Sequence, residues 1–429
     1  MSSKRLRWPR GFLETLTQEE VKALQWRMLV PQLEHAYSNS PFYRRSFDVA
    51  GVHPKDIKSL DDYYAKVPFI SKEVFIENQA KSPPFGDFLA VPRSKLRHLF
   101  YAPGPLMIPL TERDYDWVVK VVSRTLYIMG MRPGMIVDVT ANYNWVIAGK
   151  LLDSGFRRTG GVVLPGGVGN SQTHIELLKL TRAEGLLAFP TFAQTLFETA
   201  KEMGIDPRRD LNIKNIFIFG EVRTEKGKRE LSEAFGAAVR ETYGTADLGL
   251  VAAECPEGGG MHITADNIFE VIDPATGKHV PWGEGGEVVG CDLKRQAMPV
   301  IRYRTGDITE GLNLEPCPCG LTTPRLKRIL GRSGDIARIK GMFISPRQIE
   351  GVLAGYTELG RYQIIVERPG LRDELTICVE CRGPVPSDDL RVRLIEQLKA
   401  ALRVTPEVRL LKEGTIPQGA RVVDDRRRV

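Results

Sequence analysis

Short apolar runs alternate with longer amphipathic segments in the middle of the chain. The runs cover residues 135–139, 161–165, 186–189 and 215–219. The segments between them, 145–152, 173–184 and 191–203, carry apolar residues at helical spacing. This alternation is typical of a largely parallel sheet with helices on both faces. In such sheets ligands bind beyond the carboxyl ends of the strands, so the residues after each run are candidates for a site.

The flanking segments have other patterns. Residues 17–48 are helical, with a break at Asn39-Ser40-Pro41. After residue 260 the apolar runs shorten and turns multiply, and residues 331–341 are charged and rich in glycine. We predict an α/β protein in which a large N-terminal domain (1–330) has mostly parallel sheets flanked by helices. It would include a small β-rich subdomain at about 260–330, followed by a hinge (331–341) and a small C-terminal α+β domain (342–429).

Composition narrows the classes of protein. The 429 residues are 42% hydrophobic and 26% charged, which excludes a disordered or disulfide-dense chain. The net charge of +7 fits an anionic small ligand or an acidic protein partner, and we expect neither nucleic acid nor membrane binding. With six cysteines and no apolar stretch of signal-peptide or membrane-span length, the chain is expected in the cytoplasm.

A series of motifs extends from about residue 20 to about residue 425. The most specific are Tyr303-Arg304-Thr305-Gly306-Asp307, Gly331-Arg332 and Lys340-Gly341. Others are Asn39-Ser40-Pro41-Phe42-Tyr43-Arg44, Pro84-Phe85-Gly86, Leu164-Pro165-Gly166-Gly167, Tyr243-Gly244 and Cys317-Pro318-Cys319-Gly320. In this order the motifs resemble the phenylacetate–coenzyme A ligase branch of the adenylate-forming superfamily. The resemblance implies two half-reactions. ATP first converts an acid to an acyl-adenylate, and the thiol of coenzyme A then attacks it after the C-terminal domain rotates.

The resemblance also implies positions for the ligands. The residues at positions that hold nucleotide or coenzyme A are Gly220, Glu221, Tyr243, Gly244, Thr245, Asp247, Asp307, Arg332, Lys340 and Gly341. The acyl pocket would be lined by Tyr143, Asn144, Phe189, Phe192 and Phe219, whose aromatic rings favour a flat aryl acid. The alternatives are a structural turn at 303–307 and ordinary core packing of the aromatic residues.

The chain departs from the family's pattern at four places. The phosphate loop is replaced by residues 101–109, which have no lysine, and no hydroxyl after Tyr101. The tail from Gly414 to Asp424 also lacks the family's catalytic lysine, so no catalytic residue is assigned. Asp247 stands where a glutamate usually helps to hold Mg²⁺, and Gly334 replaces an acid of the hinge. ATP and Mg²⁺ binding are therefore doubtful on the sequence alone.

A second set of residues has the chemistry of a metal site. Cys255, His262, Cys317 and Cys319 resemble metal-bearing positions of the family, and three thiolates with one imidazole suit a structural zinc ion. The alternative is unpaired thiols in loops. The other histidines, His35, His53, His98, His174 and His279, stand apart from any obvious acid in the sequence.

All four departures concern the ATP half-reaction or the switch between the two halves. The sequence therefore favours a ligase homologue that transfers an acyl group, aryl by preference, from a coenzyme A thioester to another thiol. The phosphopantetheine arm of an acyl carrier protein is the expected acceptor. An ATP-dependent aryl-CoA ligase and a non-catalytic acyl-CoA-binding scaffold are the alternatives. The identity of the acid and assembly as a homodimer stay open.

Overall fold

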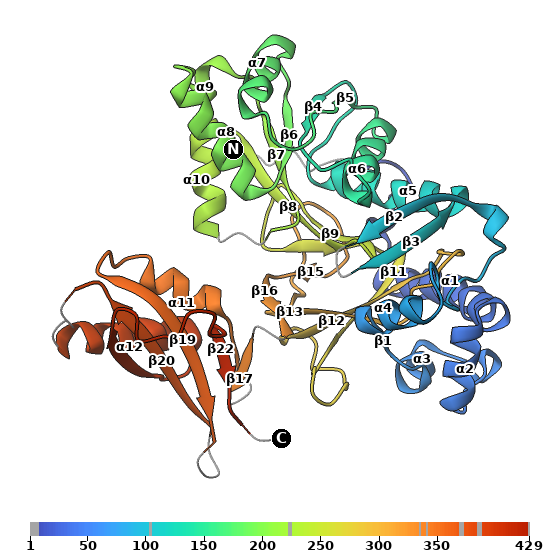
Figure 1. Ribbon diagram of the computed structural model, residues 1–429. Coiled ribbons are helices and arrows are strands. Elements are labelled where there is room, and N and C mark those ends of the chain that lie inside the picture. Colours follow the sequence, from blue (N-terminus) through green and yellow to red (C-terminus); the bar gives the residue numbers. More distant parts are fainter. Residues whose placement is uncertain are drawn as a thin grey trace.

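The structure, a computed structural model, describes residues 8–102, 105–221, 225–333, 336–339, 342–368, 373–383 and 388–427 (Figure 1). The N-terminal helices are α1 (Gln18–Asn39), α2 (Pro41–Val49), α3 (Leu60–Lys66), α4 (Lys72–Lys81) and α5 (Glu112–Ile128). The central helices are α6 (Ile147–Arg158), α7 (Ser171–Thr181), α8 (Pro190–Glu202), α9 (Pro207–Asp210) and α10 (Glu225–Phe235). The C-terminal helices are α11 (Pro346–Leu353) and α12 (Asp388–Leu402).

A nine-stranded sheet forms the centre of the molecule. Its strands are, in spatial order, β14 (Leu312–Asn313), β15 (Arg325–Leu326), β10 (Met261–Ile263), β9 (Gly249–Glu254), β8 (Ala238–Thr245), β7 (Asn215–Ile218), β6 (Gly185–Ala188), β4 (Ile136–Val139) and β5 (Val162–Leu164). The half from β5 to β8 is parallel, and the half from β8 to β14 is antiparallel.

Helices cover both faces of the parallel half. The buried side chains of α5 and α6 share one apolar cluster with Val137, Val139 and Leu187. Those of α7, α8 and α10 form another with Leu186 and Ala188. Strands β4, β6 and β7 are almost completely buried, and apart from Asp138 on β4 and Asn215 on β7 they read as near-continuous apolar runs, whereas β5 is partly exposed. The predicted α/β fold class is confirmed.

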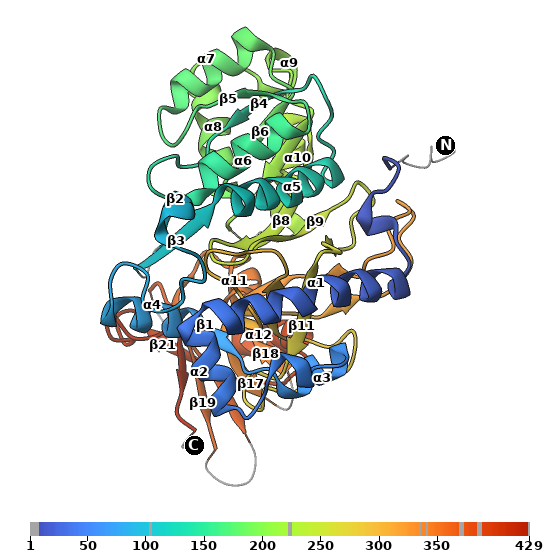
Figure 2. The same cartoon turned by 90° about the vertical axis from the view of Figure 1, so that its right-hand side faces the viewer.

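A five-stranded sheet joins the N-terminal segment to the β-rich region. It contains β1 (Ile70–Ser71), β13 (Tyr303–Thr309), β12 (Gly286–Asp292), β11 (Asn267–Ile272) and β16 (Ile329–Arg332). Helix α1 lies beside β11 (Figure 2). A hairpin of β2 (Leu96–Ala102) and β3 (Leu106–Thr111) precedes α5.

Helix α5 is tied to the β-rich region at its first turn. Asp114 completes a capping box with Thr111 and also accepts hydrogen bonds from the backbone N–H groups of Gln296 (2.6 Å) and Ala297 (3.1 Å). The fully buried carboxylate thus satisfies donors from two distant segments, which fixes α5 against the strand ends.

The C-terminal part has its own sheet, in orange and red in Figure 1. Strands β21 (Glu407–Lys412), β20 (Glu374–Cys381), β19 (Leu359–Glu367) and β22 (Val423–Asp425) lie in that order. A short hairpin of β17 (Ala337–Ile339) and β18 (Met342–Ile344) precedes them. The buried apolar residues from Ala337 onward form a separate cluster. None of the described helices combines the length and the hydrophobicity that crossing a membrane requires.

Candidate functional site

Three side chains meet where β8 of the nine-stranded sheet approaches β13 and β16 of the five-stranded sheet. The Tyr243 hydroxyl on β8 donates to Oδ2 of Asp307 on β13 at 2.8 Å. Arg332 Nη1, at the end of β16, lies 3.4 Å from the other carboxylate oxygen of Asp307. Burial raises the pKa of Asp307, while Tyr243 and Arg332 act to lower it. We call these three residues the Tyr243–Asp307–Arg332 cluster; its half-exposed guanidinium leaves one side open to a ligand.

Asp247 lies next to this cluster in the fold. The Tyr303 hydroxyl donates to Asp247 Oδ2 at 2.7 Å, and Arg295 donates to the backbone carbonyl of Asp247. The second carboxylate oxygen, Oδ1, is buried and has no hydrogen-bond partner among the described residues. A buried anionic oxygen without a partner is costly, so it is suited to a cation or a hydrogen-bond donor from a ligand.

The loop after β7 closes onto the start of α8. Glu221 accepts hydrogen bonds from both the backbone N–H (3.1 Å) and the hydroxyl (2.8 Å) of Thr191. Gly220 has φ +74°, and a Cβ there would lie 2.4 Å from the Phe189 ring. Only glycine therefore fits between the loop and Phe189.

The predicted acyl-pocket residues do not all come together. Phe189 and Phe219 pack with their ring centroids 4.4 Å apart, and Tyr143 belongs to the same apolar cluster. Phe192 instead packs on the opposite face of the sheet, where its ring contacts His174. The Asn144 side chain has no described partner, and its backbone N–H bonds to Asn142.

The segment at the phosphate-loop position is a tight hairpin. Strands β2 and β3 pair as far as Ala102 opposite Leu106. The backbone N–H of Tyr101 donates to the carbonyl of Trp145 at 2.9 Å, which fixes the hairpin against the loop after β4. Residues 103 and 104 lie outside the described residues.

The tail that lacks the family's lysine is anchored to the C-terminal sheet. Arg361 donates to the carbonyls of Ile416 (2.9 Å) and Pro417 (3.0 Å), and the buried Glu380 accepts from the Ile416 N–H at 2.6 Å. Gln363 donates to the carbonyl of Arg421 at 3.0 Å. Gly334, Lys340 and Gly341, which the sequence analysis assigned to the hinge and the ligand site, lie outside the described residues.

Cys255, His262, Cys317 and Cys319 do lie together. Their sulfur and nitrogen donor atoms are all within 4.8 Å of one another. The sulfurs of Cys255 and Cys317 are 3.6 Å apart, and Cys319 Sγ is 3.4 Å from His262 Nε2. In a tetrahedron around zinc with Zn–S bonds of about 2.3 Å, sulfur atoms are separated by about 3.8 Å, so the spacing fits.

Hydrogen bonds at His262 and Cys255 favour the binding of a cation by this cysteine–histidine cluster. His262 Nδ1 lies 2.9 Å from the Thr323 carbonyl, and a hydrogen bond there leaves Nε2 as the free donor atom. The hydrogen bond from Cys319, and next the one from His262, lower the pKa of Cys255 to about 3. Burial is nearly complete for Cys255, His262 and Cys319.

Three histidines have acidic partners, contrary to the expectation from the sequence. His174 Nδ1 is 2.6 Å from Asp138, His279 Nε2 is 2.7 Å from Glu270, and His98 is 3.3 Å from Glu112. The first pair is completely buried, and its remaining polar atoms have no partner among the described residues. The partners are 36, 9 and 14 residues apart in the printed sequence, and no local pattern links them.

Comparison with known proteins places these features in a family. The family model of the AMP-binding enzyme C-terminal domain matches residues 341–427. The phenylacetate-coenzyme A ligase of Thermus thermophilus is 34% identical over 95% of this chain and 96% of its own length. The ligase of the same name from Escherichia coli is 30% identical over 95% and 94%. The chain therefore belongs to the phenylacetate–coenzyme A ligase family within the adenylate-forming superfamily.

Solved structures agree with this assignment. The open conformation of a 2-hydroxyisobutyryl-CoA ligase in complex with 2-HIB-AMP and coenzyme A has a TM-score of 0.87 at 29% identity, over 99% of this chain and 95% of that one. The same ligase in its thioesterification state has a TM-score of 0.73, at 28% identity over 100% of this chain and 95% of that one.

These findings overturn the main functional prediction from the sequence. The full-length relatives are coenzyme A ligases, and the structural neighbours hold an acyl-AMP. The interpretation as an ATP-independent acyltransferase, together with the doubt about ATP, is therefore wrong. The prediction gave too much weight to two lost lysines and too little to the similarity of the whole chain.

Proposed function

We propose that the protein is an ATP-dependent acid–coenzyme A ligase. A carboxylate oxygen of the acid attacks the α-phosphorus of ATP, and pyrophosphate leaves with the electron pair. The coenzyme A sulfur then attacks the acyl carbon, AMP leaves, and the thiol proton passes to solvent. The observation that carries this proposal is the full-length similarity to ligases, 30–34% identical over about 95% of the chain.

The Tyr243–Asp307–Arg332 cluster supplies groups for the nucleotide. Asp307 accepts hydrogen bonds from ribose hydroxyls, since its carboxylate is held in one orientation by Tyr243. Arg332 offers the neighbouring cation for phosphate, for which the guanidinium geometry is suited. The partnerless Oδ1 of Asp247 would hold Mg²⁺, which supplies charge neutralisation at the phosphates when it is bound.

The relatives and the packed rings of Phe189 and Phe219 support an aryl acid as the substrate. The relatives are phenylacetate ligases, and Phe189 packs on Phe219 next to Gly220. A small aryl acid such as phenylacetate is the first substrate to test. Phe192 is not part of this proposal, because it packs in the other apolar cluster.

The two-step scheme includes a rotation of the C-terminal domain between the two half-reactions. The fit to the open state of the 2-hydroxyisobutyryl-CoA ligase is better than the fit to its thioesterification state. We place the hinge at residues 331–341, between domains 1–330 and 342–429. Arg332 lies at the start of this segment. Rotation about the hinge would move the tail, which Arg361 and Glu380 anchor to the C-terminal sheet, relative to the nucleotide.

Zinc at the cysteine–histidine cluster is part of the proposal. The donor set is closed by four protein ligands, so the metal would have a structural role. It would connect β9 and β10 to the loop before β15. Trp8 also contacts this loop, because its indole N–H donates to the Cys319 carbonyl at 2.7 Å. Assembly as a homodimer stays a prediction.

The test is incubation of the full chain with ATP, Mg²⁺, coenzyme A and a panel of aryl and small aliphatic acids. We expect acid-dependent pyrophosphate release and an acyl-CoA product by mass spectrometry. Without coenzyme A, an acyl-AMP bound to the protein is expected. Pyrophosphate release from no acid of the panel, by protein that is folded and metal-loaded, would refute the proposal.

A further inference from the structure

A cavity outside the candidate ligase site has an unassigned lining. It has a volume of about 780 Å³ and lies between α1, the start of α3, β11 and the segment 279–284. Its lining includes none of the residues proposed above for nucleotide, acid or zinc. The volume falls within the range of small-molecule pockets.

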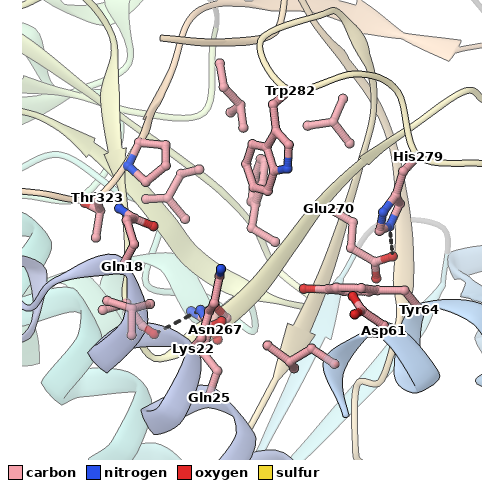
Figure 3. Close-up of a pocket in the computed structure, with 18 of the residues that line it drawn as sticks. Gln18, Lys22, Gln25, Asp61, Tyr64, Asn267, Glu270, His279, Trp282 and Thr323 are labelled. Carbon is pink, nitrogen blue, oxygen red and sulfur yellow. Dashed lines mark hydrogen bonds and ion pairs between the residues drawn. The ribbon is translucent and has the colours of Figure 1, made fainter. Parts of the chain in front are cut away.

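Aromatic side chains form much of the pocket wall. They are Trp26 on α1, Tyr64 on α3, Phe269 on β11 and Trp282. Trp282 is 73% exposed, so its indole ring is accessible to a ligand. Figure 3 shows Trp282 at one side of the pocket and Tyr64, next to Asp61, at another. Faces of Trp and Tyr attract organic cations.

The lining of the pocket has more acidic than basic side chains, although the whole chain has a positive net charge. Glu19, Asp61, Glu270 and Glu284 line the pocket against Lys22 and Lys58 only, in a protein of net charge +7. Glu270 is neutralised by Arg302 (3.2 Å) and lies 2.7 Å from His279 Nε2, and Glu19 pairs with Lys22 (3.3 Å). Within the part of the chain that the structure describes, Asp61, Glu284 and Lys58 have no ion-pair partner, so the unpaired side chains of the lining are two carboxylates and one ammonium group.

The neutral polar groups are also oriented as acceptors. Gln25 donates its amide N–H groups to the carbonyls of Ala265 (3.2 Å) and Asn267 (2.8 Å), and Gln18 donates to the carbonyl of Thr322 (2.7 Å). Each glutamine therefore keeps its side-chain oxygen for a donor from a ligand. Figure 3 shows Gln18 and Gln25 on the side of the pocket opposite Tyr64 and His279.

We propose that this pocket binds an organic cation, an amine that carries an aromatic or alkyl group. The ring lies against the aromatic side chains of Trp282 and Tyr64, and the carboxylates of Asp61 and Glu284 attract the ammonium group, with the glutamine oxygens as further acceptors. The site is separate from the ligase site, and its occupancy does not depend on the ligase proposal.

The test is calorimetry of the full chain with three probes that have a similar shape and different charges. They are phenethylammonium, the neutral 2-phenylethanol and the anionic phenylmethanesulfonate. We expect saturable one-to-one binding of the ammonium probe, at least tenfold tighter than the alcohol and with no measurable binding of the sulfonate. Equal binding of the ammonium and alcohol probes would overturn the charge argument, and no saturable binding of any probe would overturn the site.

Two variants, with three substitutions at exposed residues, locate the binding. Asp61→Asn with Glu284→Gln is expected to weaken binding of the ammonium probe at least tenfold, and Trp282→Ala by a similar factor. The matched control is Glu176→Gln with Glu233→Gln, which removes two exposed carboxylates from helices α7 and α10, away from the pocket. Binding that is unchanged in both pocket variants, or equally reduced in the control, would overturn the assignment.

Discussion

The cysteine–histidine cluster and the Tyr243–Asp307–Arg332 cluster differ in how open they are. Both join distant segments of the chain. In the first, Cys255, His262 and Cys319 are almost completely buried, and each donor atom faces the others. In the second, the side chain of Arg332 is 52% exposed, beside the segment where we place the hinge. A closed donor set can only stabilise the fold, whereas an open one can be completed by a substrate. Substitutions in the two clusters are therefore expected to separate stability from activity.

Cys319→Ser is expected to have the largest effect. Removing one of four ligands leaves the other donors buried without their metal, at a cost of about 4 kcal/mol in the free energy of unfolding. The measurements are thermal unfolding and zinc content by elemental analysis, with a chelator applied to the unmodified protein. Cys378→Ala, which removes a buried thiol outside the cluster, is the control and is expected to keep its zinc. Two results together would contradict the zinc site. The unmodified protein would be purified without zinc, and it would unfold at the same temperature as the Cys319→Ser variant.

Asp307→Asn is expected to lower kcat/KM for acid-dependent pyrophosphate release about 100-fold. The amide keeps the shape but loses the charge that orients Tyr243 and Arg332. The unfolding temperature is expected to change little, in contrast to Cys319→Ser. A variant that lost stability in proportion to activity would show that Asp307 is structural.

Tyr243→Phe is expected to lower kcat/KM about fivefold, since one hydrogen bond to a carboxylate is removed. Tyr362→Phe provides a matched control in the C-terminal domain, where the hydroxyl donates to Glu350 at the same distance of 2.8 Å. Steady-state kinetics of the two variants are compared at fixed ATP. An equal loss in both would point to a general effect on folding.

Glu241→Gln gives the smallest expected effect, which is on the pH dependence of stability. Burial raises the pKa of Glu241 from 4.5 to about 7, although Lys228 at 3.3 Å acts to lower it. The folded state thus holds this proton more tightly than the unfolded chain. The stability from this group is complete below pH 4.5 and is lost as the pH rises to about 7.

The glutamine variant removes this titration. Glu225 and Glu254, which also contact Lys228, remain in place. We expect a smaller fall in unfolding temperature between pH 5 and pH 8 than in the unmodified protein, as measured by scanning calorimetry. Glu176→Gln is the exposed control, and an identical pH profile in Glu241→Gln would contradict the assignment.

The sequence predicted the parallel half of the sheet well. Strands β4 to β7 begin and end within one residue of the predicted runs. Strands β4, β6 and β7 are buried and therefore have a near-continuous apolar pattern, and the partly exposed β5 is apolar as well. Helix α6 was predicted to end at residue 152 but extends to Arg158. Gly155 interrupts the pattern there because α5 packs closely: a Cβ at this position would lie 2.4 Å from Val122.

The sites were harder to predict. Cysteine and histidine can be found by residue type alone, so the four donors could be grouped from the sequence. The pairs His174–Asp138 and His279–Glu270 could not, because a carboxylate is common and its partner is fixed only by tertiary packing. The same limit applies to the aromatic pocket, whose lining comes from residues 18 to 324.

Strand β1 is only two residues long, yet it pairs with one edge of β13 beside Tyr303 and Arg304. The Ile70 N–H donates to the Arg302 carbonyl at 3.2 Å, so the N-terminal segment adds a strand to a sheet that is formed by residues far along the chain. A truncated product that starts after Ser71 would expose backbone donors and acceptors along this edge, and such edges recruit other strands. Shortened forms of this protein are thus expected to self-associate, and expression boundaries are best drawn before β1.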